Sequence, residues 1–189
     1  MSEKQPKNLV LKLALLGDPA VGKTSLIDQY IQHRFREDYQ PTLGVNLVVK
    51  ELKIEELKLN ARLVLWDIAG QNKYDLSRKM FFQGCMGALL VYDTTRQPTF
   101  KNIETKWLRD LKKYSERELV YILIGNKIDL KEANIISTEE GKKLADKMKA
   151  CAFIETSAKY GDNVEIAFRK LVTQVLINMG VEDLNLNSV

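Results

Sequence analysis

The stretch Gly17-Asp18-Pro19-Ala20-Val21-Gly22-Lys23-Thr24 decides the fold of this chain. It has the pattern Gly-x4-Gly-Lys-Thr, it directly follows an apolar run at residues 9–16, and it opens a stretch with the period of a helix. Glycines let backbone N–H groups converge on phosphate oxygens, the helix N-terminus adds a favourable dipole, and the Lys23 ammonium neutralises β- and γ-phosphates. The Thr24 hydroxyl can serve as a ligand for Mg²⁺. The sequence therefore predicts a loop that binds nucleotide phosphates; the alternative is a Gly-rich turn that only caps a helix.

Outside this loop, short apolar runs bounded by turn residues alternate with stretches of helical period, which is typical of βαβ units around a largely parallel sheet. Six strands are predicted, at residues 9–16, 47–54, 61–66, 87–92, 120–124 and 152–154. The second and third strands are separated only by a charged stretch at residues 55–60, so we expect them to be antiparallel neighbours. The predicted fold class is α/β, the P-loop NTPase fold: a six-stranded, mostly parallel sheet with one antiparallel edge strand, flanked by about five helices.

Several of the helices can be located from side-chain spacing. Residues 162–178 carry apolar side chains at i, i+3, i+4 and i+7, which predicts one buried helical face. Ser137 stands three residues before Glu140, a capping box that predicts a helix from there to about Ala150. A further helix is marked by the spacing of Ile103, Trp107 and Leu111.

The composition indicates one ordinary folded domain. Of 189 residues, 45% are hydrophobic and 29% charged, and we expect an N-terminal extension at residues 1–8, a domain at 9–178 and a tail at 179–189. The net charge of +4 is small and mixed along the chain, so nucleic acid is not an expected partner, and we expect a monomer.

The sequence has no apolar signal region and no apolar run of roughly 18 residues, and its second residue is Ser2 rather than the glycine that N-myristoylation requires. The expected location is therefore the cytoplasm.

The cysteines and the single histidine predict no redox or metal chemistry. Cys85 and Cys151 lie in apolar sequence, which favours buried thiols in a reducing compartment over a disulfide, with a reactive thiol as the alternative. His33 has no Cys or second His near it in the sequence, so a transition-metal site is not expected.

A second motif ends the third predicted strand, where Asp67 is followed by Gly70 and Gln71. Asp67 can hold Mg²⁺ directly or through water, the Gly70 amide is free to approach a γ-phosphate, and Gln71 is placed to orient an attacking water. Read alone, this segment is an ordinary strand-ending turn. Beside a phosphate-binding loop it predicts a site for metal binding and hydrolysis.

A third motif, Asn126-Lys127-Ile128-Asp129, decides which base is bound. The Asp129 carboxylate can accept the two adjacent N–H groups of guanine, which adenine does not offer in that arrangement, and an unpaired carboxylate penalises the wrong base. The segment 155–159 follows the sixth strand, and one of its backbone amides can meet the guanine carbonyl oxygen. Each segment alone could be a surface loop; together they predict a guanine nucleotide, GTP or GDP, with Mg²⁺.

With these motifs in this order, the chain resembles a Ras-superfamily small GTPase, and most of all its Rab branch, over residues 9–175. The resemblance implies that Phe35 lies against the guanine ring, that Tyr39 folds over the phosphates, and that Thr42 completes the Mg²⁺ shell when GTP is bound. It also implies that the nucleotide contacts Ala20, Val21, Gly22, Lys23, Thr24, Ser25, Asn126, Lys127, Ser157, Ala158 and Lys159. The implied function is a switch in vesicle traffic that hydrolyses GTP to GDP and has effectors, exchange factors and GTPase-activating proteins as partners.

Some positions depart from the Rab pattern. Leu47 stands where an aromatic is usual, in a patch with Trp66 and Phe81 through which Rab proteins commonly meet effectors, and Asn72 replaces a usual glutamate. Pro19 stands where glycine is frequent, and proline fixes φ and lacks an N–H, which leaves the hydrolysis rate open. No cysteine follows Cys151, so the expected lipid attachment signal is missing, and any peripheral membrane association is not encoded in this sequence.

Two other functions could use the same loop. A non-hydrolysing interaction module would need neither Gln71 nor Thr42, and an ATP-dependent phosphoryl-transfer enzyme is disfavoured by Asp129. The residues directly before Thr42 are Tyr39, Gln40 and Pro41 and include no arginine, so we expect slow hydrolysis by the protein alone and acceleration by an arginine from a partner.

Overall fold

The computed structural model describes residues 7–36, 41–54, 59–69, 78–115 and 119–181. They contain a sheet of six strands in the order β2-β3-β1-β4-β5-β6. The strands are β1 (Lys7–Leu16), β2 (Val45–Ile54), β3 (Leu59–Ile68), β4 (Gly87–Asp93), β5 (Val120–Asn126) and β6 (Phe153–Thr156). In this sheet the edge pair β2·β3 is antiparallel and the other pairs are parallel. The predicted α/β fold with one antiparallel edge strand is confirmed, and β2 and β3 each extend beyond their predicted lengths because their end residues, such as Val45 with Ile68, also pair.

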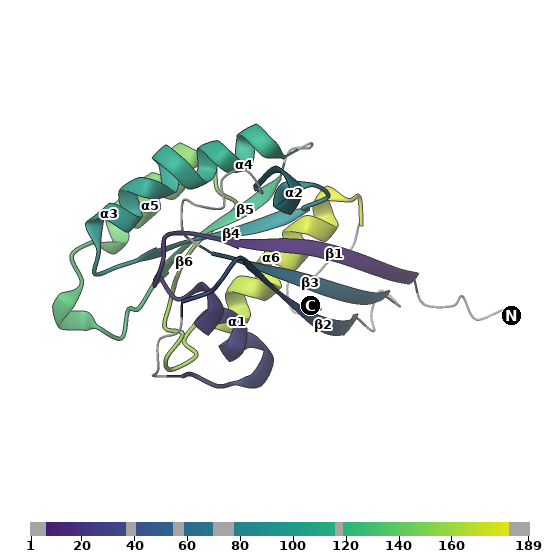
Figure 1. Ribbon diagram of the computed structural model, residues 1–189, viewed down its shortest axis with the longest axis horizontal. Coiled ribbons are helices and arrows are strands. Elements are labelled where there is room, and N and C mark those ends of the chain that lie inside the picture. The colour runs from purple at the N-terminus through teal and green to yellow at the C-terminus, as the bar shows by residue number, and fades with distance from the viewer. Residues whose placement is uncertain (1–6, 37–40, 55–58, 70–77, 116–118, 182–189) are drawn as a thin grey trace, which may run out of the picture.

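Helices cover both faces of the sheet (Figure 1). One face carries α1 (Lys23–Gln32) and α6 (Val164–Asn178). The other face carries α2 (Arg78–Phe82), α5 (Thr138–Met148) and a continuous helical segment formed by α3 (Gln97–Asn102), the π-helical η3 (Ile103–Leu108) and α4 (Arg109–Tyr114). A short 3₁₀ turn, η4 (Lys131–Ala133), follows β5.

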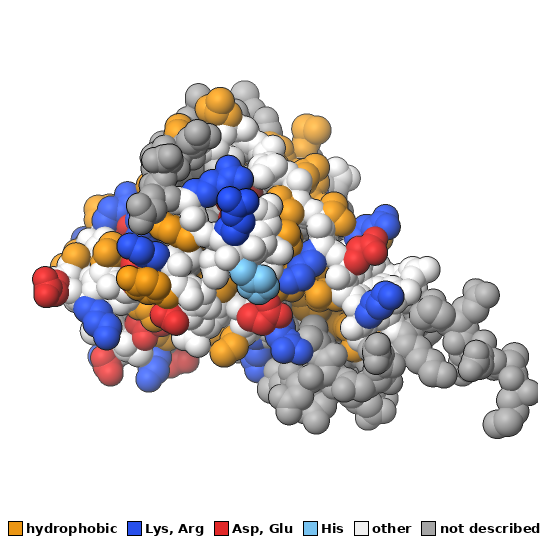
Figure 2. All heavy atoms as spheres, turned by 90° about the horizontal axis from the view of Figure 1, so that it is seen from below, with side chains coloured by type: hydrophobic (Ala, Val, Ile, Leu, Met, Phe, Trp, Pro, Cys, Tyr) orange, Lys and Arg blue, Asp and Glu red, His pale blue; other side chains and the backbone are white. Residues whose placement is uncertain are grey.

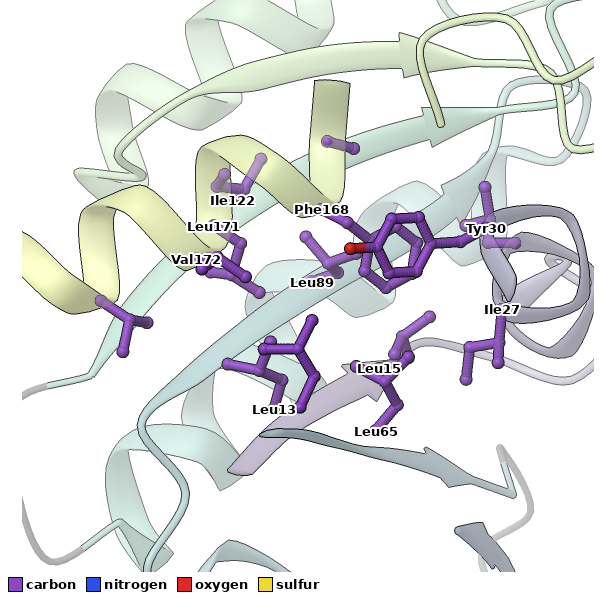
Figure 3. Close-up of a cluster of buried hydrophobic side chains, with 14 of the residues drawn as sticks. Leu13, Leu15, Ile27, Tyr30, Leu65, Leu89, Ile122, Phe168, Leu171 and Val172 are labelled. Atoms are coloured by element: carbon purple, nitrogen blue, oxygen red, sulfur yellow. The ribbon is translucent and has the colours of Figure 1, made fainter. Parts of the chain in front are cut away.

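The face with α1 and α6 is held by a core of leucines and two aromatic rings (Figure 3). Tyr30 of α1 stacks on Phe168 of α6 with ring centroids 4.1 Å apart and planes within 4°. Such pairs stabilise a fold by about 0.5–1.5 kcal/mol beyond the apolar area that they bury. The contact fixes α1, and with it the loop that precedes α1, against the C-terminal helix, whose predicted buried face is confirmed.

The opposite face buries Trp107 completely and is bounded by α5. The predicted capping box of α5 is confirmed: the Ser137 amide donates to Glu140 Oε2 (2.8 Å), and the Glu140 amide donates to Ser137 Oγ (3.3 Å). The helix ends at Met148, slightly before the predicted end, because Lys149 takes the left-handed conformation with φ 60°.

The two cysteines differ. Cys85 is buried, and burial raises the pKa of its thiol to about 11. The prediction that Cys151 is also buried is wrong, because it lies in the turn between α5 and β6, where its amide donates to the Tyr121 carbonyl (2.9 Å) while the side chain stays exposed. Both are free thiols.

The surface carries charges of both signs. Figure 2 shows basic and acidic side chains interspersed on the face seen from below. In the part of the chain that the structure describes, no helix is long and apolar enough to cross a membrane. Residues 1–6 and 182–189 lie outside that part, so the domain limits of 9 and 178 stay a prediction.

Candidate functional site

The Gly17–Thr24 loop connects the end of β1 to the start of α1, at the carboxyl edge of the parallel strands where α/β folds bind ligands. Its tight path needs left-handed conformations at Ala20 (φ 60°) and Gly22 (φ 100°). A Cβ atom on Gly22 would also overlap Asn126 Nδ2, closer than any real contact allows. The loop therefore depends on glycine at position 22 for both its backbone angle and its closeness to β5.

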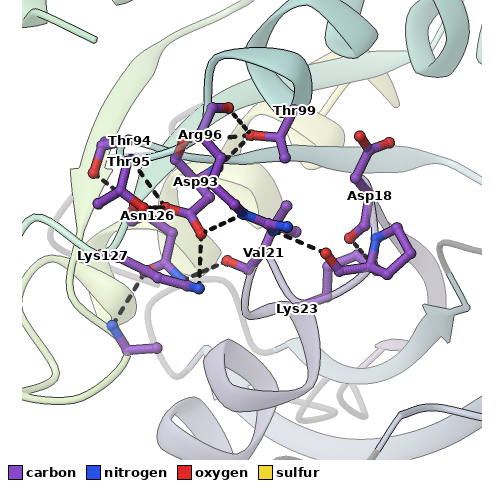
Figure 4. A network of polar contacts seen from close by, with 12 residues as sticks. Asp18, Val21, Lys23, Asp93, Thr94, Thr95, Arg96, Thr99, Asn126 and Lys127 are labelled. Atoms are coloured by element: carbon purple, nitrogen blue, oxygen red, sulfur yellow. Dashed lines mark hydrogen bonds and ion pairs between the residues drawn. The ribbon is translucent and has the colours of Figure 1, made fainter. Parts of the chain in front are cut away.

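Lys23 begins α1 and is almost fully buried inside the loop (Figure 4). Its ammonium donates to the backbone carbonyl oxygens of Gly17 (2.8 Å) and Asp18 (3.0 Å). Burial lowers its pKa to about 8, a shift that the nearby carboxylates of Asp67 and Asp18 partly oppose. A buried cation of this kind is a strong site for the negative charge of a phosphate.

The three predicted metal ligands lie together beside the loop. Thr24 Oγ1 donates to Asp67 Oδ2, Thr24 Oγ1 and Thr42 Oγ1 are 2.9 Å apart, and Thr42 Oγ1 is 3.4 Å from the same carboxylate oxygen. They come from α1, the segment before β2, and β3, and the Ala69 amide holds the last two together by donating to the Gly44 carbonyl (2.9 Å).

This group fits a hard divalent cation. Asp67 Oδ1 is buried and has no hydrogen-bond partner among the described residues, and burial raises the pKa of Asp67 despite hydrogen bonds from Thr24. Mg²⁺ prefers oxygen ligands and is commonly bound by one or two carboxylates together with substrate phosphates. One carboxylate and two hydroxyls next to a phosphate-binding loop match that preference.

The predicted base-recognition motif is joined to the predicted phosphate-binding loop by one side chain. Asn126, at the end of β5, is buried; its Nδ2 donates to the Val21 carbonyl (2.9 Å), and its Oδ1 accepts from Thr156 Oγ1 (3.0 Å) and the Ala158 amide (3.2 Å). Three loops, after β1, β5 and β6, therefore meet at Asn126. It acts here as a structural link rather than as a surface contact.

Asp129 lies on the outer side of this link. Its Oδ1 accepts from Ser157 Oγ (2.7 Å), which orients the carboxylate and leaves its second oxygen free of protein partners among the described residues. Lys127 takes a left-handed backbone conformation (φ 73°), and its ammonium pairs with Asp93 Oδ2 at 2.7 Å. The Asp129 carboxylate and the aliphatic stem of Lys127 thus lie at the same edge of the sheet.

Asp93, at the end of β4, is a member of the site that the motifs did not identify. Its carboxylate accepts from Thr95, Arg96 (Nε, 2.9 Å) and Lys127, and although burial alone would raise its pKa, Lys127 and Thr95 hold the pKa of Asp93 below its usual value. The only sequence signal was its place at a strand end beside the other motifs. Arg96 and Thr95 line a hollow of about 480 Å³ next to the loop, together with Asp18, Pro19, Gln97, Pro98, Thr99 and Ile135.

The other predicted nucleotide contacts either lie apart from the hydrogen bonds described above or fall outside the described residues. Phe35 is 38% exposed, and Lys159 is exposed with its ammonium 5.7 Å from the Tyr160 ring; their contacts with a base stay a prediction. Ser25 lies in the first turn of α1. The predicted contacts Tyr39, Gly70 and Gln71 lie outside the described residues.

Comparison with known proteins agrees with this geometry. A family model described as the Ras family matches residues 12–177. The chain belongs to the Ras family. It is similar to the Ras-related protein RABA6b of Arabidopsis thaliana, with 40% identity over 88% of this chain and 71% of the relative. It is also similar to the Ras-related proteins YPT3 of Nicotiana plumbaginifolia (39%, over 88% of this chain and 74% of the relative) and Rab11D of Lotus japonicus (38%, over the same shares).

These relatives assign this Ras-family chain to the Rab branch of the small GTPases, as the motifs predicted. The Rab-type patch is present but altered. Trp66 and Phe81 lie with ring centroids 6.1 Å apart, the Lys12 ammonium lies 3.8 Å from the centroid of the Trp66 ring, and Leu47, at the position noted above as usually aromatic, is 53% exposed. The patch therefore presents less aromatic surface than the Rab pattern described above.

Proposed function

We propose that this protein is a switch that binds GTP with Mg²⁺, hydrolyses it to GDP, and binds effector proteins in the GTP form. The observation that carries the proposal is the convergence on Asn126, which ties the phosphate loop to the Asp129 loop. One nucleotide then spans both, with its phosphates near Lys23 and its base near Asp129. Family membership supports the same conclusion.

In this proposal each group has a separate task. Lys23 offsets the charge that develops on the phosphates, and Thr24, Thr42 and Asp67 hold Mg²⁺, which when bound supplies further positive charge at the β- and γ-phosphates. Asp129 selects guanine because its two carboxylate oxygens accept the two adjacent N–H groups of the base, with Oδ1 also accepting from Ser157 Oγ. Gln71 aligns the attacking water. Catalysis is then mainly positioning, and in such sites the gain comes from fixed charges and donors.

Switching follows from Thr42 and Gly70. Both are proposed to contact the γ-phosphate or its metal, so that the segments 35–42 and 70–80 are ordered with GTP and relax after hydrolysis. Effectors, exchange factors and activating proteins are the proposed partners, and membrane traffic is the proposed setting by analogy with the Rab branch.

A direct test has two steps. Competition binding should show that GTP and GDP displace a fluorescent guanine nucleotide and that ATP does not. Single-turnover phosphate release from the wild type should then proceed at about 10⁻⁴ to 10⁻² s⁻¹, and Gln71→Leu should abolish it without weakening GTP binding. Displacement by ATP as readily as by GDP would contradict guanine specificity. Equal rates of release for the wild type and Gln71→Leu would indicate a binding module without this catalytic site.

A further inference from the structure

The outer side of the phosphate loop is held by side chains from the α3–η3 segment. Asp18 is the second residue of the loop and is 9% exposed. Its Oδ1 accepts from the indole Nε1 of Trp107 (2.8 Å), and its Oδ2 accepts from Asn102 Nδ2 (2.7 Å). Arg96 Nη2 donates to the Pro19 carbonyl (2.9 Å). We call Asp18, Asn102 and Trp107 the loop brace.

The brace reaches Lys23 through the backbone of Asp18. The Asp18 side chain is fixed by Trp107 and Asn102, while the Asp18 carbonyl accepts one of the two hydrogen bonds from the Lys23 ammonium (3.0 Å). A rotation of the Asp18 backbone would therefore disturb both the Asp18 carboxylate and the Lys23 ammonium. Trp107 is 0% exposed, so its indole has little freedom to follow a loop that moves.

The π-helical turn explains why two donors can share one carboxylate. Asn102 and Trp107 are five residues apart, and in an α-helix with 3.6 residues per turn they would point about 140° apart around the axis. A π-helix bonds residue i to residue i+5, which brings such positions onto one side. The η3 segment, Ile103–Leu108, begins directly after Asn102 and contains Trp107. The π-helical turn thus lies at the position where it brings Asn102 and Trp107 toward the Asp18 carboxylate.

From this geometry we propose that Trp107, with Asn102, is a positioning residue for nucleotide retention: it holds Asp18, and through Asp18 the loop geometry that places Lys23 against the phosphates. The inference rests on the proposed function, because it concerns the same nucleotide. Trp107 touches the loop and not the ligand. Hydrogen bonds to a charged group are among the stronger ones in proteins, so loss of one should be visible in the rate of nucleotide release.

The first test is Trp107→Phe, which keeps an aromatic ring at this buried position and removes the indole N–H together with part of the ring system. We expect GDP to dissociate about tenfold faster, with guanine specificity retained. Tyr30→Phe is the control for loss of a polar group from a buried ring, because it keeps the ring stacked on Phe168 and removes a hydroxyl that has no hydrogen-bond partner among the described residues. Its GDP dissociation rate should stay within about twofold of the wild type.

A second test exchanges the carboxylate of Asp18 and the amide of Asn102. Asn102→Asp places two carboxylates together and should also speed GDP release, and adding Asp18→Asn should restore a donor–acceptor pair and slow release again. A merely structural role for the helix would not produce this rescue. If Trp107→Phe and Tyr30→Phe change the release rate equally, or if the exchange does not rescue retention, the proposal is wrong.

Hydrogen exchange of the backbone amides of residues 17–23 gives a readout that does not depend on the nucleotide. Exchange should be faster in Trp107→Phe than in Tyr30→Phe or the wild type, both with and without GDP. Failure of the wild type to bind GDP would contradict the proposed function, while unchanged exchange in Trp107→Phe would contradict the brace.

Discussion

Asn126→Asp tests whether the link between the phosphate loop and the base loop stabilises the protein. The change is nearly isosteric and leaves the acceptor that faces Thr156 Oγ1 and the Ala158 amide. It replaces only the donor that faces the Val21 carbonyl at 2.9 Å with an oxygen. The lost hydrogen bond is worth about 1 kcal/mol, and the buried, unsatisfied oxygens cost a further 1–3 kcal/mol, so we expect the free energy of unfolding to fall by about 2–4 kcal/mol at pH 8.

The loss should depend on pH. A protonated carboxyl group can donate to the Val21 carbonyl, so the folded state raises the pKa of the new group above its unfolded value of about 3.9. The native variant then binds more protons than the unfolded one, and its stability relative to the wild type falls as pH rises from about 4 through the folded pKa. A difference of about 2 kcal/mol corresponds to roughly 1.5 pH units, so most of the loss should develop between about pH 4 and pH 6.

Urea unfolding of both proteins at pH 4.5, 6 and 8, followed by circular dichroism, measures this difference. Asn60→Asp is the control, because Asn60 Nδ2 donates to Asn8 Oδ1 (3.1 Å) at an exposed site and the same chemical change should cost within about 0.5 kcal/mol. A loss for Asn126→Asp below about 0.5 kcal/mol, or one that is the same at every pH, would refute the reasoning.

Three further predictions concern the loop and its cation. Gly22→Ala should weaken GDP binding at least tenfold and destabilise the protein by about 1–3 kcal/mol, because the new Cβ meets Asn126 and φ is 100°; calorimetry and urea unfolding measure the two effects. Burial lowers the pKa of Lys23 to about 8, so GDP affinity should fall as pH rises above 8, by at most about tenfold per unit, while Lys23→Arg should show a flat profile. Burial raises the pKa of Asp67, so protons should compete with Mg²⁺ and its effect on GDP release should weaken as pH falls through that raised pKa; in Asp67→Asn, Mg²⁺ should have little effect on GDP release at any pH.

Much of the fold follows from local sequence patterns. Apolar runs and helical spacing predicted all six strands, the antiparallel edge and the buried face of α6, because burial of one face imposes a period on nearby residues. Thr24 and Asp67 were predicted as metal ligands from their places beside β1 and at the end of β3, and Thr42 was implied by the family resemblance. The structure brings the three side chains together, and their role as metal ligands stays a prediction.

What the sequence did not predict depends on contacts between distant residues. Asp18 and Trp107 are 89 positions apart, and nothing in the neighbourhood of either predicts their hydrogen bond. Ile103 and Trp107 in the π-helical segment Ile103–Leu108 are four residues apart, a spacing that buried side chains also have in an α-helix, so periodicity could not identify the π-helical turn. Cys151 was assigned to the core from its apolar neighbours, yet a turn residue can be exposed between buried ones.

The two tryptophans of this chain occupy different parts of the molecule. Trp107 is buried in the interior with its indole N–H on Asp18, whereas Trp66 is partly buried on β3, at the same face of the sheet, with the Lys12 ammonium 3.8 Å from its ring. Indole fluorescence responds to nearby charge and to water, so the molecule contains two native optical probes, one at the phosphate loop and one at the patch with Leu47 and Phe81. Replacing either ring by phenylalanine would leave a single emitter, which could follow nucleotide exchange or partner binding separately, without any attached dye.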